Sequence, residues 1–428
     1  MSIKEKIRKS SPGFVFWTHK VRGVSAHYLY GRPSHRLRVI GVTGTNGKTT
    51  TCHLIVKILE EAGARVGMAT TTTFKVGGRE WTNKTNMTTV SPFGLQKLLK
   101  QMVQAGCQYA VVETTSHAVA QHRNWGIKYH AVVLTNITHD HLDYHGNFND
   151  YLETKLKLFK NNPQISVVNA DDPSAKRFLE QPAGRHLSYS IESRADVTAR
   201  KILPDRDGTI FTLVLPTVQA TIDYHLLGRF NISNAIAAAA TCFGLGVPIE
   251  AIKRGLEKIS AVPGRMEKID AGQDFTVIVD YAHTPDALEK AYSSLKEGIR
   301  GKMIAVLGAC GDRDKTKRPI MGAIAGRFAD IVVVTDEEPY HENPEEIIEQ
   351  VAQGVPRGGK KMQLDENYFK ILDRREGIKK ALSLAERNDL VIITGMGAQE
   401  FRVVGDKHMS WNDPKVVREE LAKLGFAK

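Results

Sequence analysis

The sequence predicts an α/β fold made of two doubly wound domains, a central phosphate-loop (P-loop) domain and a smaller C-terminal Rossmann-like domain. Short β-rich apolar runs alternate with helical patterns, which is typical of a mostly parallel sheet covered on both faces. A glycine-rich turn that ends in Gly47-Lys48-Thr49 joins the first predicted strand to the first helix. The alternation then restarts after Pro263-Gly264, a pair that indicates a hinge.

The central domain is expected over residues 37–262. Its strands are predicted at Leu37–Val42, Ala110–Val112, Ala131–Leu134 and Ile165–Asn169. Its helices include Lys48–Ala62, Phe93–Ala105 and the alanine-rich, buried Asn231–Gly244. Residues 185–227 carry short alternating segments with turn residues, and we expect antiparallel hairpins there.

The C-terminal domain is expected over residues 263–428. Its strands are predicted at Thr276–Asp280, Met303–Gly308, Ile331–Thr335 and Leu390–Thr394. Helical patterns lie between these strands, so the region is interpreted as a second doubly wound sheet.

The composition is that of a globular, cytoplasmic protein. The 428 residues are 42% hydrophobic and 25% charged, and no apolar run approaches the roughly 18 residues that a spanning helix needs. The N-terminus lacks a secretory signal, and the four scattered cysteines form no CxxC pair. Most of the net charge of +12 lies in residues 1–38, so the remainder is nearly balanced and no nucleic-acid-binding surface is indicated.

The turn at residues 41–50 has the context of a phosphate-binding loop, because it follows a strand and opens a helix. Glycines let backbone N–H groups approach phosphates, and a helix N-terminus favours negative charge. Lys48 is expected to contact the outer phosphates and Thr49 to bind Mg²⁺. Val42 replaces the first glycine of the usual pattern, and a glycine-rich turn without a ligand is the alternative. The predicted ATP-binding residues are Gly44, Thr45, Asn46, Gly47, Lys48, Thr49 and Thr50.

Five segments together resemble the Mur ligases, which add amino acids to the peptidoglycan precursor. They are Gly44–Thr50, Glu113–His117, Thr135–Gly146, Gly264–Glu267 and Val279–Ala287. The resemblance runs from about residue 37 to the C-terminus and is closest to the MurE branch, which adds the third residue. It implies a cell-wall ligase that uses ATP to activate a muramyl-peptide carboxylate as an acyl-phosphate and then joins it to an amino acid.

The resemblance also implies two Mg²⁺ ions and a modified lysine. It assigns Thr49 and Glu113 to the first ion, and Glu113, His141 and a carbamylated Lys155 to the second. Reaction with CO₂ would turn Lys155 from a cation, which repels a metal, into an anionic oxygen ligand. Ordinary strand-end, loop and surface roles are the alternatives for these residues. The expected catalytic residues are Lys48, Glu113, His141 and Lys155.

Further contacts follow from the same resemblance. It places Asn234, Arg265, Asp280 and His283 near the nucleotide. It assigns the muramyl-peptide acceptor to Thr88, Thr89, Thr115, Gln121 and Arg123. Arg313 is expected to bind the carboxylate of the amino acid.

The C-terminal domain departs from the pattern of the diaminopimelate-adding members. Their Asp-Asn-Pro-Arg segment, whose arginine holds the distal carboxylate of diaminopimelate, is matched by residues 336–340 here. Glu338 replaces the asparagine and Tyr340 the arginine, so Glu337 and Glu338 favour a cationic side chain such as lysine or ornithine. The usual Gly-Lys-Gly-His-Glu stretch becomes Gly395-Met-Gly-Ala-Gln399.

Residues 1–36 are expected to be too few to form the separate front domain that holds the UDP end of the acceptor in this family. They are basic and rich in aromatic residues. They are interpreted either as a peripheral contact with an anionic membrane, which would suit a lipid-linked acceptor, or as a helix packed against the central domain.

The leading interpretation is a monomeric MurE-like ligase. The alternatives are the same chemistry on a lipid-linked or non-wall acceptor, and an inactive nucleotide-binding scaffold. Folylpolyglutamate synthetases share the architecture but resemble the chain less at residues 140–146 and 280–288. The amidating relatives carry a cysteine-rich zinc module that the cysteine pattern does not match.

Overall fold

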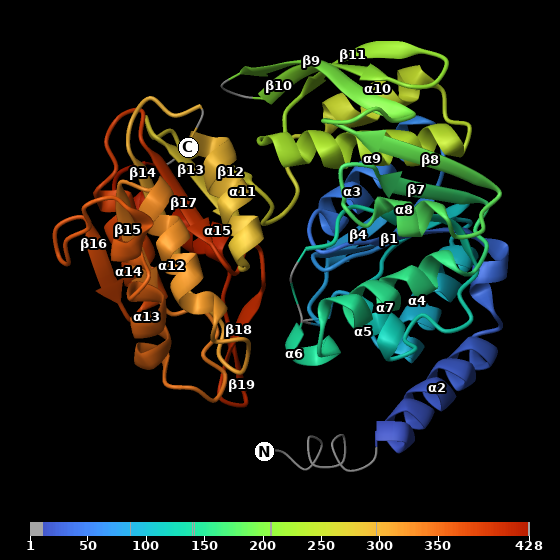
Figure 1. Ribbon diagram of the computed structural model, residues 1–428, viewed down its shortest axis with the longest axis horizontal. Helices are drawn as coiled ribbons and strands as arrows, with labels where there is room; N and C mark the ends of the chain where they lie inside the picture. The colour runs from blue at the N-terminus through green and yellow to red at the C-terminus, as the bar shows by residue number, and fades with distance from the viewer. Residues whose placement is uncertain are drawn as a thin grey trace. The chain divides into compact units, whose positions relative to one another are not determined.

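The computed structural model describes residues 12–426 except 86, 139, 141, 206, 207 and 297 (Figure 1). Two compact units divide these residues. The first comprises the described residues up to Leu203, together with Ile210–Tyr224 and Phe230–Ile259, and the second comprises the other described residues. Each unit has its own sheet with helices on its faces, which confirms the predicted α/β class.

The first unit is built on an eleven-stranded sheet of order β11-β10-β9-β8-β7-β6-β1-β5-β2-β3-β4. The strands are β1 (Arg38–Thr43), β2 (Val66–Ala69), β3 (Thr73–Val76), β4 (Arg79–Thr82), β5 (Tyr109–Glu113), β6 (Tyr129–Leu134), β7 (Ile165–Asn169), β8 (Arg185–Ser190), β9 (Val197–Asp205), β10 (Gly208–Val214) and β11 (Gln219–Tyr224). The central strand β1 pairs in parallel with β5 and β6. These strands are buried throughout except at Arg38 and His130, as the near-continuous apolar runs predict.

The helices of the first unit cover this sheet. They are α2 (Pro12–Leu29), η1 (Pro33–Arg36), α3 (Lys48–Glu61), α4 (Pro92–Gln104), α5 (Ser116–Ala120), α6 (Leu142–His145), α7 (Phe148–Phe159), α8 (Ala175–Leu179), α9 (Arg229–Gly244) and α10 (Ile249–Lys258). Asn147 caps α7 by accepting a hydrogen bond from the Asp150 N–H (2.9 Å), which fixes where this helix begins. The alanine run of α9 is fully buried, as expected. Among the described helices, none combines the length and apolar character that crossing a bilayer requires.

The expectation of antiparallel hairpins over residues 185–227 is wrong for the first of these strands. Strand β8 pairs in parallel with β7, and Tyr189 and Ser190 of β8 pair in parallel with Val197 and Thr198 of β9. The short helix α8 lies between β7 and β8 in the chain and makes this crossover. Alternating polarity indicated the strands but not the direction of their pairing.

The second unit has a six-stranded sheet of order β12-β13-β17-β14-β15-β16 and a separate hairpin, β18-β19. The strands are β12 (Glu267–Ile269), β13 (Thr276–Asp280), β14 (Met303–Leu307), β15 (Ile331–Thr335), β16 (Tyr368–Ile371), β17 (Leu390–Thr394), β18 (Phe401–Val404) and β19 (Lys407–Ser410). The helices are α11 (Pro285–Lys296), α12 (Lys317–Phe328), α13 (Pro344–Ala352), η2 (Val355–Gly358), α14 (Arg374–Ser383) and α15 (Asp413–Lys423). Strand β12 is antiparallel to β13, and the other neighbours are parallel.

A buried ion pair holds α14 and α15 together in this unit. The Arg374 guanidinium donates to both carboxylate oxygens of Asp413 (2.9 and 2.6 Å) and to the Thr394 carbonyl (2.9 Å), and both charged side chains have no solvent exposure. Arg374→Ala would leave Asp413 buried without its partner, so we expect the free energy of unfolding to fall by about 3–5 kcal/mol. Urea unfolding measures this change. Lys379→Ala is the control, because Lys379 pairs with Glu376 at the surface of the same helix and its loss should cost at most about 1 kcal/mol. An equal loss in both variants would contradict the prediction.

Candidate nucleotide and ligase site

The glycine-rich loop between β1 and α3 is held in a defined shape by residues that follow β6. Asn136 accepts a hydrogen bond from the Asn46 N–H at its Oδ1 (2.9 Å) and donates to the Asn46 carbonyl (3.1 Å). Thr135 Oγ1 donates to the same carbonyl (2.6 Å). Gly47 has φ +82°, and a Cβ there would collide with the Asn234 side chain. The loop therefore needs glycine at this position, and Asn234 lies directly against it.

Lys48 and Thr49 open helix α3 at the end of this loop. The Lys48 ammonium folds back to donate to the carbonyls of Gly44 (3.1 Å) and Thr45 (2.7 Å). The Thr49 hydroxyl donates to Glu113 Oε2 (3.0 Å), and both side chains are buried. Glu113 ends β5, the strand beside β1, so the parallel register brings a hydroxyl and a carboxylate together at the carboxyl edge of the sheet.

Lys155 lies on the buried face of α7, and its amine reaches the loop. Its Nζ donates to the Gly44 carbonyl (2.7 Å) and lies 4.6 Å from the centre of the Tyr151 ring. The side chain is 2% exposed. Burial, and then the nearby Lys48 cation, lower the pKa of Lys155 well below its usual value. Lys157, two residues on, is exposed, as expected of an ordinary surface lysine.

The residues assigned to the acceptor form one hydrogen-bonded network that ends on Glu113. Arg123 donates to the Thr89 carbonyl (2.7 Å) and to Gln121 Oε1 (2.9 and 2.6 Å). Thr89 Oγ1 donates to the Glu113 carbonyl (2.8 Å) and accepts from the Thr115 N–H (3.3 Å). The Thr88 and Thr71 hydroxyl oxygens lie within hydrogen-bond distance of each other (3.0 Å). The structure therefore brings all five predicted acceptor residues to the same strand ends as the loop.

The described residues fit a hard cation at Glu113. Magnesium prefers oxygen ligands, and the Thr49 hydroxyl and the Glu113 carboxylate already lie within hydrogen-bond distance of each other. Within the described ranges, no group of three or more histidine, cysteine or acidic side chains is arranged to hold a metal. The predicted ligand His141 lies outside the described residues.

Three residues predicted near the nucleotide lie together in the second unit, around the end of β13. The buried Asp280 carboxylate accepts from the N–H groups of Met266 (2.7 Å) and Ala282 (2.8 Å). Burial raises the pKa of Asp280, although the neighbouring Arg265 opposes this shift. The Arg265 guanidinium lies 4.1 Å from the centre of the Tyr281 ring, and His283 Nδ1 donates to the Tyr281 carbonyl (2.7 Å).

The predicted amino-acid residues gather at the ends of β14, β15 and β17. Glu337 and Glu338 are buried, and the Cys310 thiol donates to Glu337 Oε1 (3.0 Å). The other oxygen, Glu337 Oε2, is buried without a hydrogen-bond partner and faces Gly395, which has no room for a side chain. Burial, and then repulsion by Glu337, raise the pKa of Glu338 to about 7.

Arg313 and Tyr340 lie beside these two acids, whereas Gln399 contacts a different part of the second unit. The Arg313 guanidinium is 5.1 Å from the centre of the Tyr340 ring, and Tyr340 adopts a left-handed backbone (φ +49°). The Gln399 side-chain amide donates to the Tyr281 hydroxyl (3.4 Å), next to Arg265 and His283. It therefore belongs with the residues around β13.

Two residues that contact the site, Thr71 and Cys310, were not predicted from the sequence. The Thr71 N–H and hydroxyl both donate to Glu113 Oε2 (2.8 and 3.0 Å), and Cys310 lies against Glu337. The run of four threonines at residues 70–73, directly after the end of β2, is the signal that could have identified Thr71. Cys310 follows β14 in a Gly-Ala-Cys-Gly turn, but a single cysteine carries no signal of its neighbours.

Fold and site together define a P-loop nucleotide-binding protein with a second Rossmann-like unit. Residues 42–242 match the Mur ligase middle domain, and residues 264–397 match the Mur ligase glutamate ligase domain. The chain is 40% identical to the UDP-N-acetylmuramyl-tripeptide synthetase of Roseiflexus sp. (strain RS-1), over 93% of this chain and 81% of that protein. It is 37% identical to UDP-N-acetylmuramoyl-L-alanyl-D-glutamate–2,6-diaminopimelate ligase 1 of Clostridium acetobutylicum, over 95% of this chain and 82% of that one. The chain belongs to the Mur ligase family.

Solved structures give the same result for the fold. A UDP-N-acetylmuramoyl-L-alanyl-D-glutamate–2,6-diaminopimelate ligase superposes with a TM-score of 0.65 at 31% identity, over 95% of this chain and 83% of that chain. The folylpolyglutamate synthase of Mycobacterium tuberculosis superposes with a TM-score of 0.72 at 18% identity, over 95% and 94% of the two chains. At that identity, the second likeness concerns the fold alone.

Proposed function

We propose that this chain is an ATP-dependent ligase of peptidoglycan-precursor synthesis that joins an amino acid to a muramyl-peptide carboxylate through an acyl-phosphate. The observation that carries the proposal is the convergence of Lys48, Glu113 and the buried amine of Lys155 on one phosphate loop. A scaffold without activity has no need to bury a lysine at that place, since burial of an amine is costly. The similarity to a tripeptide synthetase along most of both chains favours the MurE type.

ATP would bind with its phosphates on the N–H groups of residues 44–50, and the Lys48 ammonium would turn from the loop carbonyls to the outer phosphates. Thr49 and Glu113 would hold Mg²⁺, which neutralises charge as two anions approach each other. The acceptor carboxylate attacks the γ-phosphorus, and ADP leaves. The amine of the incoming amino acid then attacks the acyl carbon, and inorganic phosphate leaves.

Lys155 is proposed to carry a carbamate in the active enzyme, and to hold a second Mg²⁺ together with Glu113 and His141. Only the neutral amine reacts with CO₂, and the lowered pKa of Lys155 makes this form more abundant than it is for an exposed lysine at the same pH. The reaction forms one N–C bond and releases one proton. The product is an anion beside Lys48, so the repulsion between the two cations becomes an attraction.

The network from Arg123 to Thr89 is proposed to bind the acceptor. Arg123 is the cation of this network and could pair with an acceptor carboxylate or phosphate. Thr89 connects this arginine to the Glu113 backbone. The acceptor would thus be positioned from the same strand that presents the metal-binding carboxylate.

The amino acid is proposed to be cationic, such as lysine or ornithine. Glu337 Oε2 is buried without a hydrogen-bond partner, and an ammonium group would supply one. Arg313 beside Tyr340 would bind the α-carboxylate. The alternative is diaminopimelate, the substrate in the names of several relatives, including that of Clostridium acetobutylicum. Competition between these amino acids in a ligation assay separates them, and selective use of diaminopimelate would exclude the cationic substrate.

The raised pKa of Glu338 predicts a pH-dependent stability. The pKa is about 7 in the folded chain and 4.5 ordinarily, so between these values the folded chain binds more protons than the unfolded chain. The free energy of unfolding therefore falls as the pH rises through this window, by up to about 3 kcal/mol. Glu338→Gln should remove this fall. Urea unfolding at pH 5 and pH 8 tests this prediction, with a Glu346→Gln variant at an exposed position as the control. An equal change in the free energy of unfolding between the two pH values in wild type and Glu338→Gln would refute it.

The proposed function is tested by phosphate release from ATP. Purified protein is supplied with Mg²⁺, single amino acids, and either UDP-linked or lipid-linked muramyl dipeptide. We expect phosphate release that requires both the amino acid and the acceptor, with a new amide in the product. Phosphate release without an acceptor would contradict the proposal, and so would the absence of phosphate release with every pair of amino acid and acceptor. Activity with a non-wall acceptor alone would replace the proposal with the same chemistry on another substrate.

A further inference from the structure

The surface formed by helix α2, the turn η1 and helix α4 combines exposed apolar side chains with an excess of positive charge. Trp17, Tyr28 and Leu29 are 59%, 62% and 68% exposed, and Val21 is 40% exposed. Residues 6–59 contain no aspartate or glutamate, and neither does α4. The exposed basic residues of this surface are Lys20, Arg22, Arg32, Arg36, Lys97 and Lys100.

The opposite face of α2 is fixed to the first unit. A Cβ at Gly23 would lie 2.7 Å from the His122 carbonyl oxygen and 2.8 Å from Trp125 Cβ, and the His27 ring packs edge-on against the Trp125 ring (5.3 Å). Ala26 is fully buried. The packed helix and the membrane contact, which the sequence offered as alternatives, therefore concern two different faces of the same helix.

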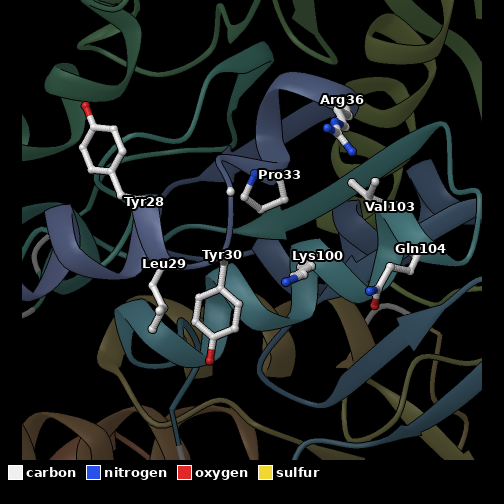
Figure 2. A pocket seen from close by; sticks show the side chains of 9 residues that line it. Tyr28, Leu29, Tyr30, Pro33, Arg36, Lys100, Val103 and Gln104 are labelled. Carbon is white, nitrogen blue, oxygen red and sulfur yellow. The ribbon is translucent and has the colours of Figure 1, made fainter.

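A pocket of about 310 Å³ opens where α2 ends, and Figure 2 shows its lining. Tyr28 and Leu29 end α2 and Tyr30 follows it, and Arg36 and Lys100 come from η1 and α4. The Lys100 ammonium lies 6.0 Å from the centre of the Tyr30 ring. The lining thus holds two cations and no acid, beside the exposed Tyr28 and Leu29 side chains of the helix.

We propose that this surface docks the protein on a bilayer that contains anionic phospholipid, with a headgroup phosphate in the pocket between Arg36 and Lys100. Tyr28 and Leu29 would enter the boundary between headgroups and acyl chains, where tyrosine and tryptophan are favoured. An exposed leucine and valine favour a bilayer over a nucleic acid as the partner of this surface. A nucleic acid offers aromatic stacking and phosphates but no aliphatic layer. The docking does not rest on the proposed ligase activity.

Vesicle flotation of the full chain tests the proposal without ATP or substrates. We expect binding to vesicles of phosphatidylglycerol and phosphatidylcholine, weaker binding at high salt, and none to phosphatidylcholine alone. Lys100→Glu lowers the net charge of the surface by two units, and each unit is worth roughly fivefold in affinity, so binding should weaken about 25-fold. Tyr28→Ser with Leu29→Ser should weaken it at least about tenfold.

Two matched controls share these chemical changes at other places in the first unit. Leu203 is 61% exposed, and the Lys176 side chain is 88% exposed. Leu203→Ser and Lys176→Glu should leave binding unchanged, and thermal melting verifies that all variants are folded. Absence of binding to anionic vesicles overturns the proposal. Losses of vesicle binding in the control variants equal to those in the test variants would also overturn the proposal. Binding to RNA or to an acidic protein, without binding to anionic vesicles, would do the same.

Discussion

Replacing Lys155 with methionine is expected to reduce the ligation rate roughly a thousandfold, because charge stabilisation by a metal contributes several kcal/mol and the carbamate is one of the proposed ligands. Methionine fills a similar volume, so the buried face of α7 should keep its packing against the loop. Removal of CO₂ should lower the wild-type rate, and added bicarbonate should restore it. The variant should respond to neither. Rates of amino-acid-dependent phosphate release measure all four conditions.

The stability of Lys155→Met shows whether its lower ligation rate reflects the missing carbamate or an unfolded protein. The pKa of unmodified Lys155 is lower in the folded chain than in the unfolded chain, so between the two values the unfolded chain binds more protons. The free energy of unfolding of CO₂-depleted wild type should therefore rise with pH in that window, and that of Lys155→Met should lack this rise. Lys157→Met, at an exposed position of the same helix, is the control and should keep full activity. A Lys155→Met enzyme with the wild-type rate would refute the role of the carbamate.

Replacing Glu113 with glutamine should lower the rate by a similar factor and raise the Mg²⁺ concentration required. The glutamine oxygen can still accept the hydrogen bonds from Thr49 and Thr71, so the change removes the charge and keeps the contacts. A neutral amide binds Mg²⁺ far less well than a carboxylate does. Titration of the rate with Mg²⁺ measures the effect.

The control for this prediction is Glu153→Gln in the same unit. Glu153 pairs with Lys160 at the surface (3.2 Å), so its neutralisation should alter neither the rate nor the Mg²⁺ requirement. If Glu113→Gln kept the wild-type Mg²⁺ dependence, Glu113 would not be a metal ligand.

Much of the fold could be predicted because its signals are local. The strands Ile165–Asn169, Thr276–Asp280, Ile331–Thr335 and Leu390–Thr394 have the predicted bounds, since buried parallel strands are short apolar runs between turns. The direction of β8 could not be predicted, because strand pairing depends on the crossover through α8 rather than on the strand itself. The short strands β2, β3, β4, β12, β16, β18 and β19 were missed, since runs of three or four residues carry little periodicity.

The site was predictable to the extent that its residues belong to contiguous motifs. The loop at residues 44–50 was identified from its glycines and Lys48. Lys155 was found only through the family resemblance, since an amphipathic helix does not indicate that one of its two lysines is buried. The contacts of Thr71 with Glu113 and of Cys310 with Glu337 join residues far apart in the chain, and one sequence contains no trace of such pairs.

The transfer of oxygen from acceptor to phosphate tests the central claim most directly. The acceptor carboxylate is labelled with oxygen-18, and the released phosphate is analysed by mass spectrometry after one round of ligation. An acyl-phosphate intermediate predicts that each phosphate carries one labelled oxygen, because the acceptor oxygen that attacks the γ-phosphorus leaves with it. Label found in AMP, or phosphate released without label, would contradict activation of the carboxylate as an acyl-phosphate at the loop of residues 44–50.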